Sequence, residues 1–288
     1  MQEFDNLLKY CVHQFENTPF CSKCMMSQCR RCNTNKCYNC LKHIHSIYTK
    51  DEHYSCNKIT FNYILKHGYR YVSEMIWAFG EYKKMFDSDT QIRIVSVGCG
   101  PSTELYAAAA VFHSTHQILY DGFDLSHIWQ SLQQFNINNF DSQSYIINYY
   151  NCDFIKYVKD NDVQSDILVL NYFLSDFVKY NTPQDCDVFM NDLVCLLQEF
   201  RFKLIIINDV MLLYNNGTGY ACMEKIASKL NLKQFSLFRR HFAKPNQWQF
   251  EYGKKHDDRI LFKTIIPEIL PYEPFETCGS IQLIIQCN

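Results

Sequence analysis

Apolar and polar positions follow a clear pattern in the first half of this 288-residue chain. An apolar, β-branched run, Ile92 to Val97, stops at a glycine turn, Gly98-Cys99-Gly100. Residues 101–113, which contain four consecutive alanines, come next, and a second apolar run at residues 117–123 ends at Asp124. Short apolar runs with turn residues on both sides are typical of buried strands. The pattern therefore predicts a strand, a glycine turn, a helix and a second strand that ends at an acidic residue.

The residues of the turn and of the second strand's end suit a bound nucleotide. Glycines let the backbone adopt positive φ and approach a ligand without a Cβ in the way. Pro101 is tolerated in the first turn of a helix, and Ser102 or Thr103 can cap its amides. An acid at the end of the next strand can accept hydrogen bonds from ribose hydroxyls. Asp124 comes 26 residues after Gly98, near the offset of roughly 20 residues expected for that role.

At these residues the chain resembles the class I S-adenosylmethionine-dependent methyltransferases. VSVGCGPSTE resembles the first motif of that family, and GFDLS resembles the second. The family pattern is acid-x-Gly-x-Gly-x-Gly, and this chain has Ser96 at the acid and Ser102 at the third glycine. Thr103 stands where dinucleotide-binding dehydrogenases have their last glycine, which argues against NAD.

The resemblance implies a Rossmann-like α/β fold with a sheet of about seven strands, mostly parallel, and an antiparallel last strand. It implies that Asp124 holds the ribose of S-adenosylmethionine, that Asp153 and Phe154 hold the adenine, and that Gly98 and Gly100 admit the amino-acid end. The full set of cofactor-binding residues that it implies is Ser96, Gly98, Cys99, Gly100, Asp124, Leu125, Asp153, Phe154 and Asn171.

The end of the fourth strand is where the family places catalytic and substrate-facing residues. The candidates in this chain are Asn171, Tyr172 and Asp176. Methyltransferases that act on base amino groups have Asn or Asp followed by two prolines here, whereas this chain reads Asn-Tyr-Phe-Leu. That departure argues against N-methylation of adenine or cytosine.

Further apolar runs complete the predicted sheet. Strands are expected at residues 144–150, 166–170 and 203–208, helices at 188–200 and 221–230, a closing antiparallel pair at 234–242 and 280–286, and an inserted hairpin at 248–262. Basic clusters at residues 239–241 and 254–256 are candidates to clamp an anionic substrate, although such runs are usually solvated.

Charge and helical periodicity divide the chain into two predicted domains, residues 1–85 and 86–288. Residues 63–85 have the apolar spacing of a long helix that joins the two. The first domain carries 12 Lys/Arg and 7 Asp/Glu, a net charge of +5, and the second carries 16 and 23, a net of −7.

A cysteine cluster dominates the first domain. Its three Cys-x-x-Cys pairs repeat every eight residues, and this spacing lets two thiolates reach one tetrahedral ion. The candidate ligands, with Cys56 able to replace either histidine, are Cys21, Cys24, Cys29, Cys32, Cys37, Cys40, His43, His45 and Cys56. Eight ligands are enough for two zinc ions. An iron–sulfur cluster is the competing interpretation, but the nearby histidines favour zinc, in a structural site closed to water.

The same segment suggests a partner. Residues 21–45 contain five basic residues and no acid, so the segment could contact phosphates, and a nucleic-acid acceptor is slightly favoured. The acidic first ten residues lack the apolar region of a signal peptide, and no run approaches the roughly 20 apolar residues of a membrane span. A cytoplasmic protein is therefore expected, with its 15 cysteines binding metal rather than forming disulfides.

Three hypotheses follow from the sequence. The leading one is an S-adenosylmethionine-dependent methyltransferase with a structural zinc module and an unidentified acceptor. The second is a cofactor-binding or regulatory protein that keeps this fold without turnover, because fold alone does not prove function. The third is a zinc-dependent nucleic-acid-binding protein on a methyltransferase-like scaffold. The sequence gives no oligomeric state.

Overall fold

A computed structural model describes most of the chain, and its described residues are 2–19, 56–113, 115–200, 202–210, 219–242, 254–255, 275 and 278–288. Eight of the nine predicted metal ligands, from Cys21 to His45, lie outside these ranges. All but two residues of the hairpin predicted at 248–262 lie outside them as well.

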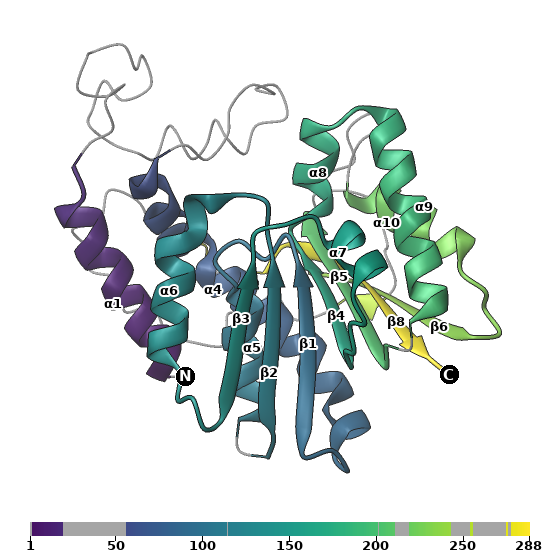
Figure 1. The fold of residues 1–288 in the computed structure, drawn as a ribbon, viewed down its shortest axis with the longest axis horizontal. Helices are drawn as coiled ribbons and strands as arrows, with labels where there is room; N and C mark the ends of the chain where they lie inside the picture. The colour runs from purple at the N-terminus through teal and green to yellow at the C-terminus, as the bar shows by residue number, and fades with distance from the viewer. Residues whose placement is uncertain are drawn as a thin grey trace.

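One mixed sheet forms the centre of the molecule, with the strand order β3-β2-β1-β4-β5-β8-β6-β7 (Figure 1). The strands are β1 (Gln91–Val97), β2 (Gln117–Phe123), β3 (Tyr145–Tyr150), β4 (Ile167–Asn171), β5 (Leu204–Val210), β6 (Phe235–His241), β7 (Lys254–Lys255) and β8 (Ser280–Cys287). Strands β1 to β5 run parallel, and β8 is antiparallel to both β5 and β6. The predicted Rossmann-like sheet, mostly parallel with an antiparallel last strand, is confirmed, and the two-residue β7 is added at its edge.

The order of the strands determines where a ligand can enter. From β1 the chain moves outward to β2 and β3, and then returns to place β4 on the other side of β1. Connections therefore leave the carboxyl ends of β1 and β4 in opposite directions. In open α/β sheets the crevice at such a reversal is where ligands bind.

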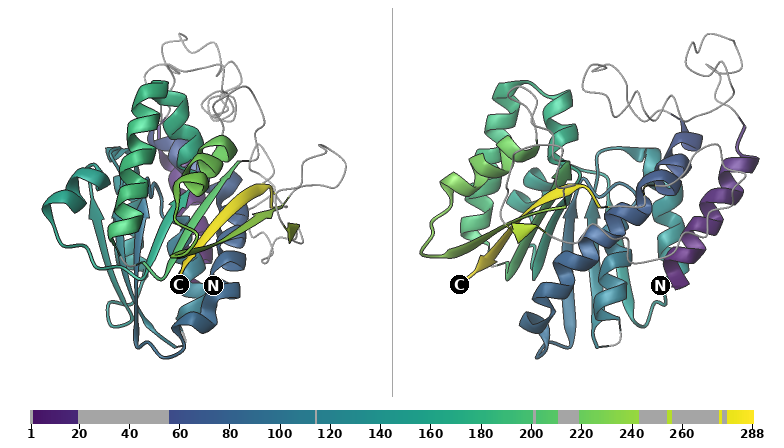
Figure 2. Two further views of the ribbon diagram at one scale, coloured as in Figure 1. Left: turned by 90° about the vertical axis from the view of Figure 1, so that its right-hand side faces the viewer. Right: turned by 180° about the vertical axis from the view of Figure 1, so that it is seen from behind.

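Helices cover both faces of the sheet (Figure 2). They are α1 (Gln2–Asn17), α4 (Asn57–Tyr82), η1 (Lys83–Phe86), α5 (Thr103–Phe112), η2 (His127–Trp129), α6 (Gln130–Asn139), α7 (Phe154–Asp160), α8 (Leu174–Tyr180), α9 (Pro183–Glu199) and α10 (Gly219–Lys229). Side chains of α1, α4, α5 and α6 form one hydrophobic core with the sheet, and side chains of α7 to α10 form the other.

The strands read as continuous apolar runs because both of their faces are buried. In β1, Ile92 and Ile94 belong to the core under α4 and α5, whereas Val95 and Val97 belong to the opposite core. The same alternation places Ile206 of β5 in the first core. Successive side chains of a strand point to opposite faces, so the central strands β1, β4, β5 and β8 contribute to both cores.

The structure adds helices that the sequence analysis did not predict. Helix α1 packs Phe4, Leu7, Leu8 and Cys11 into the core beneath α4, a spacing that suits one helical face. Helix α8 begins at Leu174, within the candidate catalytic segment, where the sequence predicted no helix. The predicted long helix is present, and α4 begins at Asn57, six residues before its predicted start.

The described part of the first predicted domain shares its core with the second. Helices α1 and α4 contribute side chains to the same hydrophobic core as β1 and α5. Among the described residues, those on either side of residue 85 therefore belong to one shared core. The division into a Cys-rich module at residues 1–85 and a second domain at 86–288 stays a prediction.

Candidate active site

A cavity of about 300 Å³ lies at the carboxyl ends of β1 to β4, where the strand order reverses. Its lining includes ten of the residues that the sequence analysis selected. They are Gly98, Cys99, Gly100, Asp124, Leu125, Asp153, Phe154, Asn171, Tyr172 and Asp176. Ser96 lies behind this lining, and Cys56 is not part of it. One space thus collects four segments that are distant in the sequence.

The glycine turn forms one wall because its backbone needs conformations that side chains rarely allow. Gly98 has φ +63° and Gly100 has φ +49°. A Cβ on Gly98 would lie 2.1 Å from Cδ2 of Phe173, so the turn and the residues after β4 are in close contact. Ser102 also has positive φ, at +62°. The third position of the glycine pattern thus keeps the left-handed backbone that a glycine would supply.

Asp124 is held in place by two backbone amides. Its Oδ2 accepts a hydrogen bond from the Gly100 N–H at 2.8 Å, and its Oδ1 accepts one from the Ser126 N–H at 2.7 Å. Burial raises the pKa of this carboxyl, whereas the two amides lower it. The carboxylate is fixed against the glycine turn, and each oxygen keeps further lone-pair capacity for a ligand hydroxyl.

The residues after β2 and β3 form a mostly apolar wall. Phe154 is buried, whereas Leu125 is 70% exposed, an unusual environment for a leucine beside a cavity. Asp153 is the N-cap of α7, and its Oδ1 accepts from the Lys156 N–H at 2.9 Å. Capping explains Asp153 in structural terms, so its assigned contact with adenine stays a prediction.

Ser96 donates to a buried acid that the sequence analysis did not select. The Ser96 hydroxyl donates to Glu104 Oε1 at 2.6 Å, and the Tyr120 hydroxyl donates to the same oxygen at 2.5 Å. Glu104 lies in the first turn of α5 and lines the cavity. Its position in the motif VSVGCGPSTE, four residues after Gly100, was the available signal.

A buried hydrogen-bond network supports the residues after β4. Asn171 donates to the Thr103 hydroxyl at 3.1 Å and accepts from Asn208 Nδ2 at 2.8 Å. Asn208 also donates to Oε2 of Glu74, on α4, at 3.1 Å. Through this chain of side chains, the end of β4 is joined to α5 on one side and to α4 on the other.

Tyr172 is fixed by the same network. Its backbone has φ +55°, its hydroxyl donates to Glu74 Oε2 at 2.9 Å, and its ring stacks on Tyr71 with centroids 3.7 Å apart. A left-handed backbone at a tyrosine is costly and persists only where surrounding contacts hold it. The hydroxyl is therefore engaged in a structural contact, and the ring is what Tyr172 offers to the cavity.

Asp176 is a cavity carboxyl whose acidity is changed by its environment. Burial, together with the neighbouring carboxyl of Asp209, raises its pKa to about 7. Burial also raises the pKa of Asp209 to about 6, although Asp209 accepts from the Ser175 N–H at 2.8 Å. A carboxyl that titrates near neutrality in a cleft is a candidate for proton transfer.

Aromatic side chains from three helices also line the cavity. Tyr63 and Tyr71 come from α4, Phe177 and Tyr180 from α8, and Phe189 from α9. None of them was selected from the sequence, because they become neighbours only in the folded chain. Among the described residues the lining contains no Lys, Arg or His.

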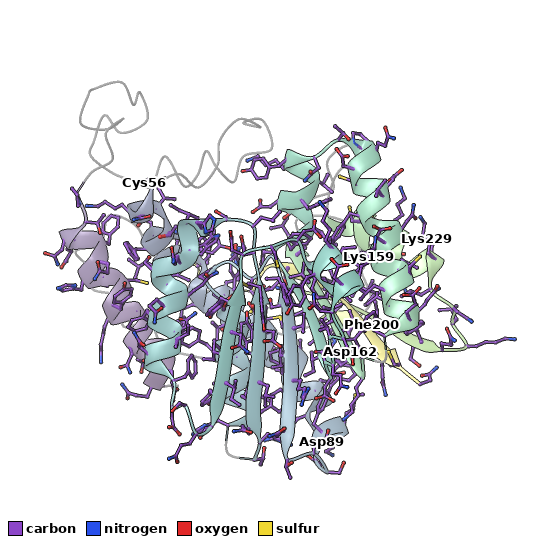
Figure 3. The ribbon with its side chains drawn as sticks, viewed as in Figure 1. Cys56, Asp89, Lys159, Asp162, Phe200 and Lys229 are labelled. Carbon is purple, nitrogen blue, oxygen red and sulfur yellow. The ribbon has the colours of Figure 1, made fainter. Side chains whose placement is uncertain are left out.

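Cys56 lies at the start of α4, on the side of the sheet where the parallel strands end, whereas Asp89 lies at the opposite end (Figure 3). Near Cys56, Lys58 Nζ donates to the carbonyl of Thr18, beyond the end of α1, at 2.9 Å. Within the described ranges no three His, Cys, Asp or Glu side chains are placed to hold a metal ion. The metal ligands predicted at residues 21–45 lie outside these ranges.

Two of the basic residues considered as substrate clamps have structural partners. Arg239 forms a bidentate pair with Glu224, with its Nε 2.6 Å from Oε1. Arg240 is buried, lies over the Tyr82 ring and pairs with Glu81 at 2.6 Å. None of these residues lines the cavity.

No described helix is long and apolar enough to cross a membrane.

No protein-family model matches this chain, and no curated protein matches it. Similar solved structures include the plantazolicin methyltransferase BpumL in complex with SAH, at 14% identity and TM-score 0.47 over 88% of this chain and 96% of that one. A methyltransferase from Archaeoglobus fulgidus is 13% identical, with TM-score 0.43 over 75% and 94%. An rRNA methylase from Streptococcus thermophilus is 7% identical, with TM-score 0.41 over 76% and 93%. These neighbours are methyltransferases, but similarity this distant carries no part of the functional argument.

Proposed function

We propose that this chain is an S-adenosylmethionine-dependent methyltransferase whose cofactor lies along the carboxyl ends of β1, β2 and β3. The observation that carries the proposal is the shared cavity. It unites the glycine turn, Asp124 and the Asp153-Phe154 pair, and it places all three beside residues 171–176. The cavity volume of about 300 Å³ is within the range of small-molecule sites.

The residues present fit this cofactor. The positive φ of Gly98 and Gly100 leaves backbone without side chains at the cavity, which suits close approach by the amino-acid end. Asp124 is anchored by two amides and offers its remaining lone pairs to ribose hydroxyls. The exposed Leu125 offers apolar surface that a purine ring would cover. When bound, S-adenosylmethionine supplies a methyl group on a sulfonium, which a nucleophile can accept.

The acceptor side is assigned to Asp176 and the aromatic residues around it. With a pKa of about 7, Asp176 is substantially ionised at neutral pH and can take the proton that an acceptor loses on methylation. Asn171 and Tyr172 position this part of the cavity through their hydrogen bonds. The described lining carries acidic and aromatic side chains, which suit a neutral or cationic acceptor group better than a phosphate.

The Cys-rich segment is assigned a supporting role on sequence grounds. We propose that it binds two zinc ions and presents an acceptor, with a nucleic acid slightly favoured. Lys58 and Thr18, which flank that segment in the sequence, are hydrogen-bonded to each other, and Cys56 lies on the cavity side of the sheet (Figure 3). Elemental analysis of protein purified without added metal tests the zinc. Iron with visible absorbance would replace zinc by a cluster, and absence of metal would end this assignment.

Nucleic-acid binding by that segment has its own test. Replacing Arg30 and Arg31 together should reduce the slope of log affinity against log salt for RNA or DNA by about 2, one unit for each lost phosphate contact. Neither replacement should change cofactor affinity. If the wild type binds neither nucleic acid at low salt, a nucleic-acid acceptor is rejected.

Calorimetry with S-adenosylhomocysteine, the demethylated cofactor, tests the main proposal. The wild type should bind, and Asp124→Ala should weaken binding by about 1.5–3 kcal/mol, because it removes a charged acceptor. Asp162→Ala is the matched control, since Asp162 is exposed and absent from the cavity lining. No binding by the wild type would reject the proposal. Equal affinity of wild type and Asp124→Ala would reject the ribose assignment, and binding without transfer to any acceptor would favour the catalytically silent alternative.

A further inference from the structure

Glu104 is a buried acid at the cavity to which neither the sequence analysis nor the proposed function gives a role. It lies in the first turn of α5, directly after the glycine turn. The residue is 1% exposed, and it lines the cavity that the glycine turn also lines. The residue therefore meets the site from the helix side of the turn.

The recorded partners of this carboxyl are neutral. Hydroxyls of Ser96 and Tyr120 both donate to Oε1, at 2.6 Å and 2.5 Å. Burial raises the pKa of Glu104, and the groups that oppose this rise are hydrogen-bond donors without charge, Asn171 among them. Among the described residues, no Lys, Arg or His lines the cavity, so none of them supplies a cation there.

A structural role alone does not require an acid here. The amide oxygen of a glutamine accepts the same two hydroxyl hydrogen bonds. An acid near a helix N-terminus gains only about 0.3–1 kcal/mol from the helix dipole when exposed, whereas burying an ionised carboxylate without a cation is expensive. A positively charged group on a bound ligand would offset the cost of burying the Glu104 carboxylate.

The other acids of the cofactor side differ from Glu104. Asp124 accepts from two backbone amides, and Asp153 caps α7. Glu104 also faces Ser96, the residue that stands at the strand-end acid position of the first motif. Two carboxylates so close would repel each other, so a short hydroxyl at residue 96 is what allows an acid to enter from α5.

We infer that Glu104 binds the α-ammonium group of the cofactor's amino-acid end, with Ser96 and Tyr120 positioning its carboxylate. This inference rests on the proposed function. It gives the cofactor's amino-acid end an acidic partner, which the first motif lacks because Ser96 stands at its acid position. In this chain the carboxylate comes from the first turn of α5 instead of the end of β1. A hydrogen bond between Ser96 and Glu104 joins these two positions.

The first test uses the wild-type protein and two probes. Calorimetry compares S-adenosylhomocysteine with its analogue in which hydrogen replaces the α-amino group. The wild type should bind S-adenosylhomocysteine about 10- to 100-fold more tightly, as expected for a charged hydrogen bond at a buried site. Equal affinities would overturn the inference while leaving the proposed function intact. Failure to bind either probe would reject the proposed function itself.

The second test assigns the discrimination to Glu104. Glu104→Gln keeps an acceptor for both hydroxyls, and it should lower the affinity for S-adenosylhomocysteine about 10- to 100-fold while leaving the desamino analogue within about twofold. Glu199→Gln, at an exposed position at the end of α9, should change neither affinity. Equal losses for both probes in Glu104→Gln would show a merely structural role. If that variant does not fold, Glu104→Asp, which keeps the charge on a shorter side chain, should lower the ratio between the two probes, and an unchanged ratio would overturn the inference.

Discussion

The two sides of the cavity are built in different ways. The cofactor side comes from one stretch of chain, residues 96–154, and backbone amides hold two of its acids, Asp124 and Asp153. The acceptor side comes from α4, the end of β4, α8 and α9, and side-chain hydrogen bonds and stacked rings hold it together. The cofactor side is a local sequence motif, whereas the residues of the acceptor side are distant in the sequence and become neighbours only on folding.

This difference has a consequence for stability and function. Backbone amides at a glycine turn are fixed by the strand and helix that flank them, so the cofactor side depends little on distant residues. The acceptor side depends on Glu74, which lies on α4 almost 100 residues before Tyr172 and accepts hydrogen bonds from four donors of three other segments. The two sides meet at the hydrogen bond between Asn171 and Thr103.

The largest expected effect is on Glu74. Glu74→Ala should lower the free energy of unfolding by about 3–5 kcal/mol, because it leaves several buried donors without their acceptor. The melting temperature should fall by about 10 °C. Thermal melts of Glu74→Ala and of the exposed control Glu199→Ala measure this. A small effect would show that the acceptor side does not depend on this acid, and a folded variant should still bind S-adenosylhomocysteine within about threefold of wild type.

The next effect contrasts two glycines. Gly98→Ala should destabilise the protein by about 2–3 kcal/mol, because the residue has φ +63° and its Cβ would meet the Phe173 ring. Gly80→Ala should instead stabilise it by about 0.5–1 kcal/mol, since Gly80 is in α4 with open space around it. Denaturant unfolding of both variants checks the opposite signs. A stable Gly98→Ala variant would contradict the close approach of the two sides.

The smallest effect concerns Asp176 and depends on pH. Because its pKa in the folded protein is about 7, above the ordinary 3.8, its contribution to stability is present below about pH 4 and is lost as pH rises through about 7. Asp176→Asn does not ionise. The variant should be more stable than wild type by about 1–2 kcal/mol at pH 8 and should approach it at pH 4.

Melting temperatures measured from pH 4 to pH 8 check this pattern, with Asp162→Asn, at an exposed position between α7 and β4, as the control. Removing Asp176 should also lower the pKa of Asp209, because each carboxyl disfavours ionisation of the other. A difference between variant and wild type that is the same at every pH would contradict the raised pKa.

Residues of the cofactor side could be predicted from the sequence because their signals are local. A β-branched run, glycines with positive φ and an acid at the next strand's end depend on neighbours within about 30 residues, and the structure brings them to one cavity. Glu104 belongs to the same motif but was missed. Its role depends on Ser96 and Tyr120 converging on one oxygen, and spacing alone does not reveal this.

Residues of the acceptor side could not be predicted in this way. Tyr63 and Tyr71 follow the apolar spacing of a helix, so the sequence cannot separate a core tyrosine from one that lines a cavity. Helix α8 was not predicted, because a helix of seven residues gives too few positions for a helical period to appear. Its Asp176 was selected through the family resemblance, but its raised pKa depends on Asp209 from another strand.

A structure determined with bound S-adenosylhomocysteine tests the central claim most directly, since it shows which side chains surround each end of the cofactor. The account predicts that the ligand occupies the cavity at the ends of β1, β2 and β3, with its ribose at Asp124, its amino group at Glu104 and its sulfur turned toward Asp176. A ligand bound elsewhere, or a cavity left empty at saturating concentrations, would contradict it.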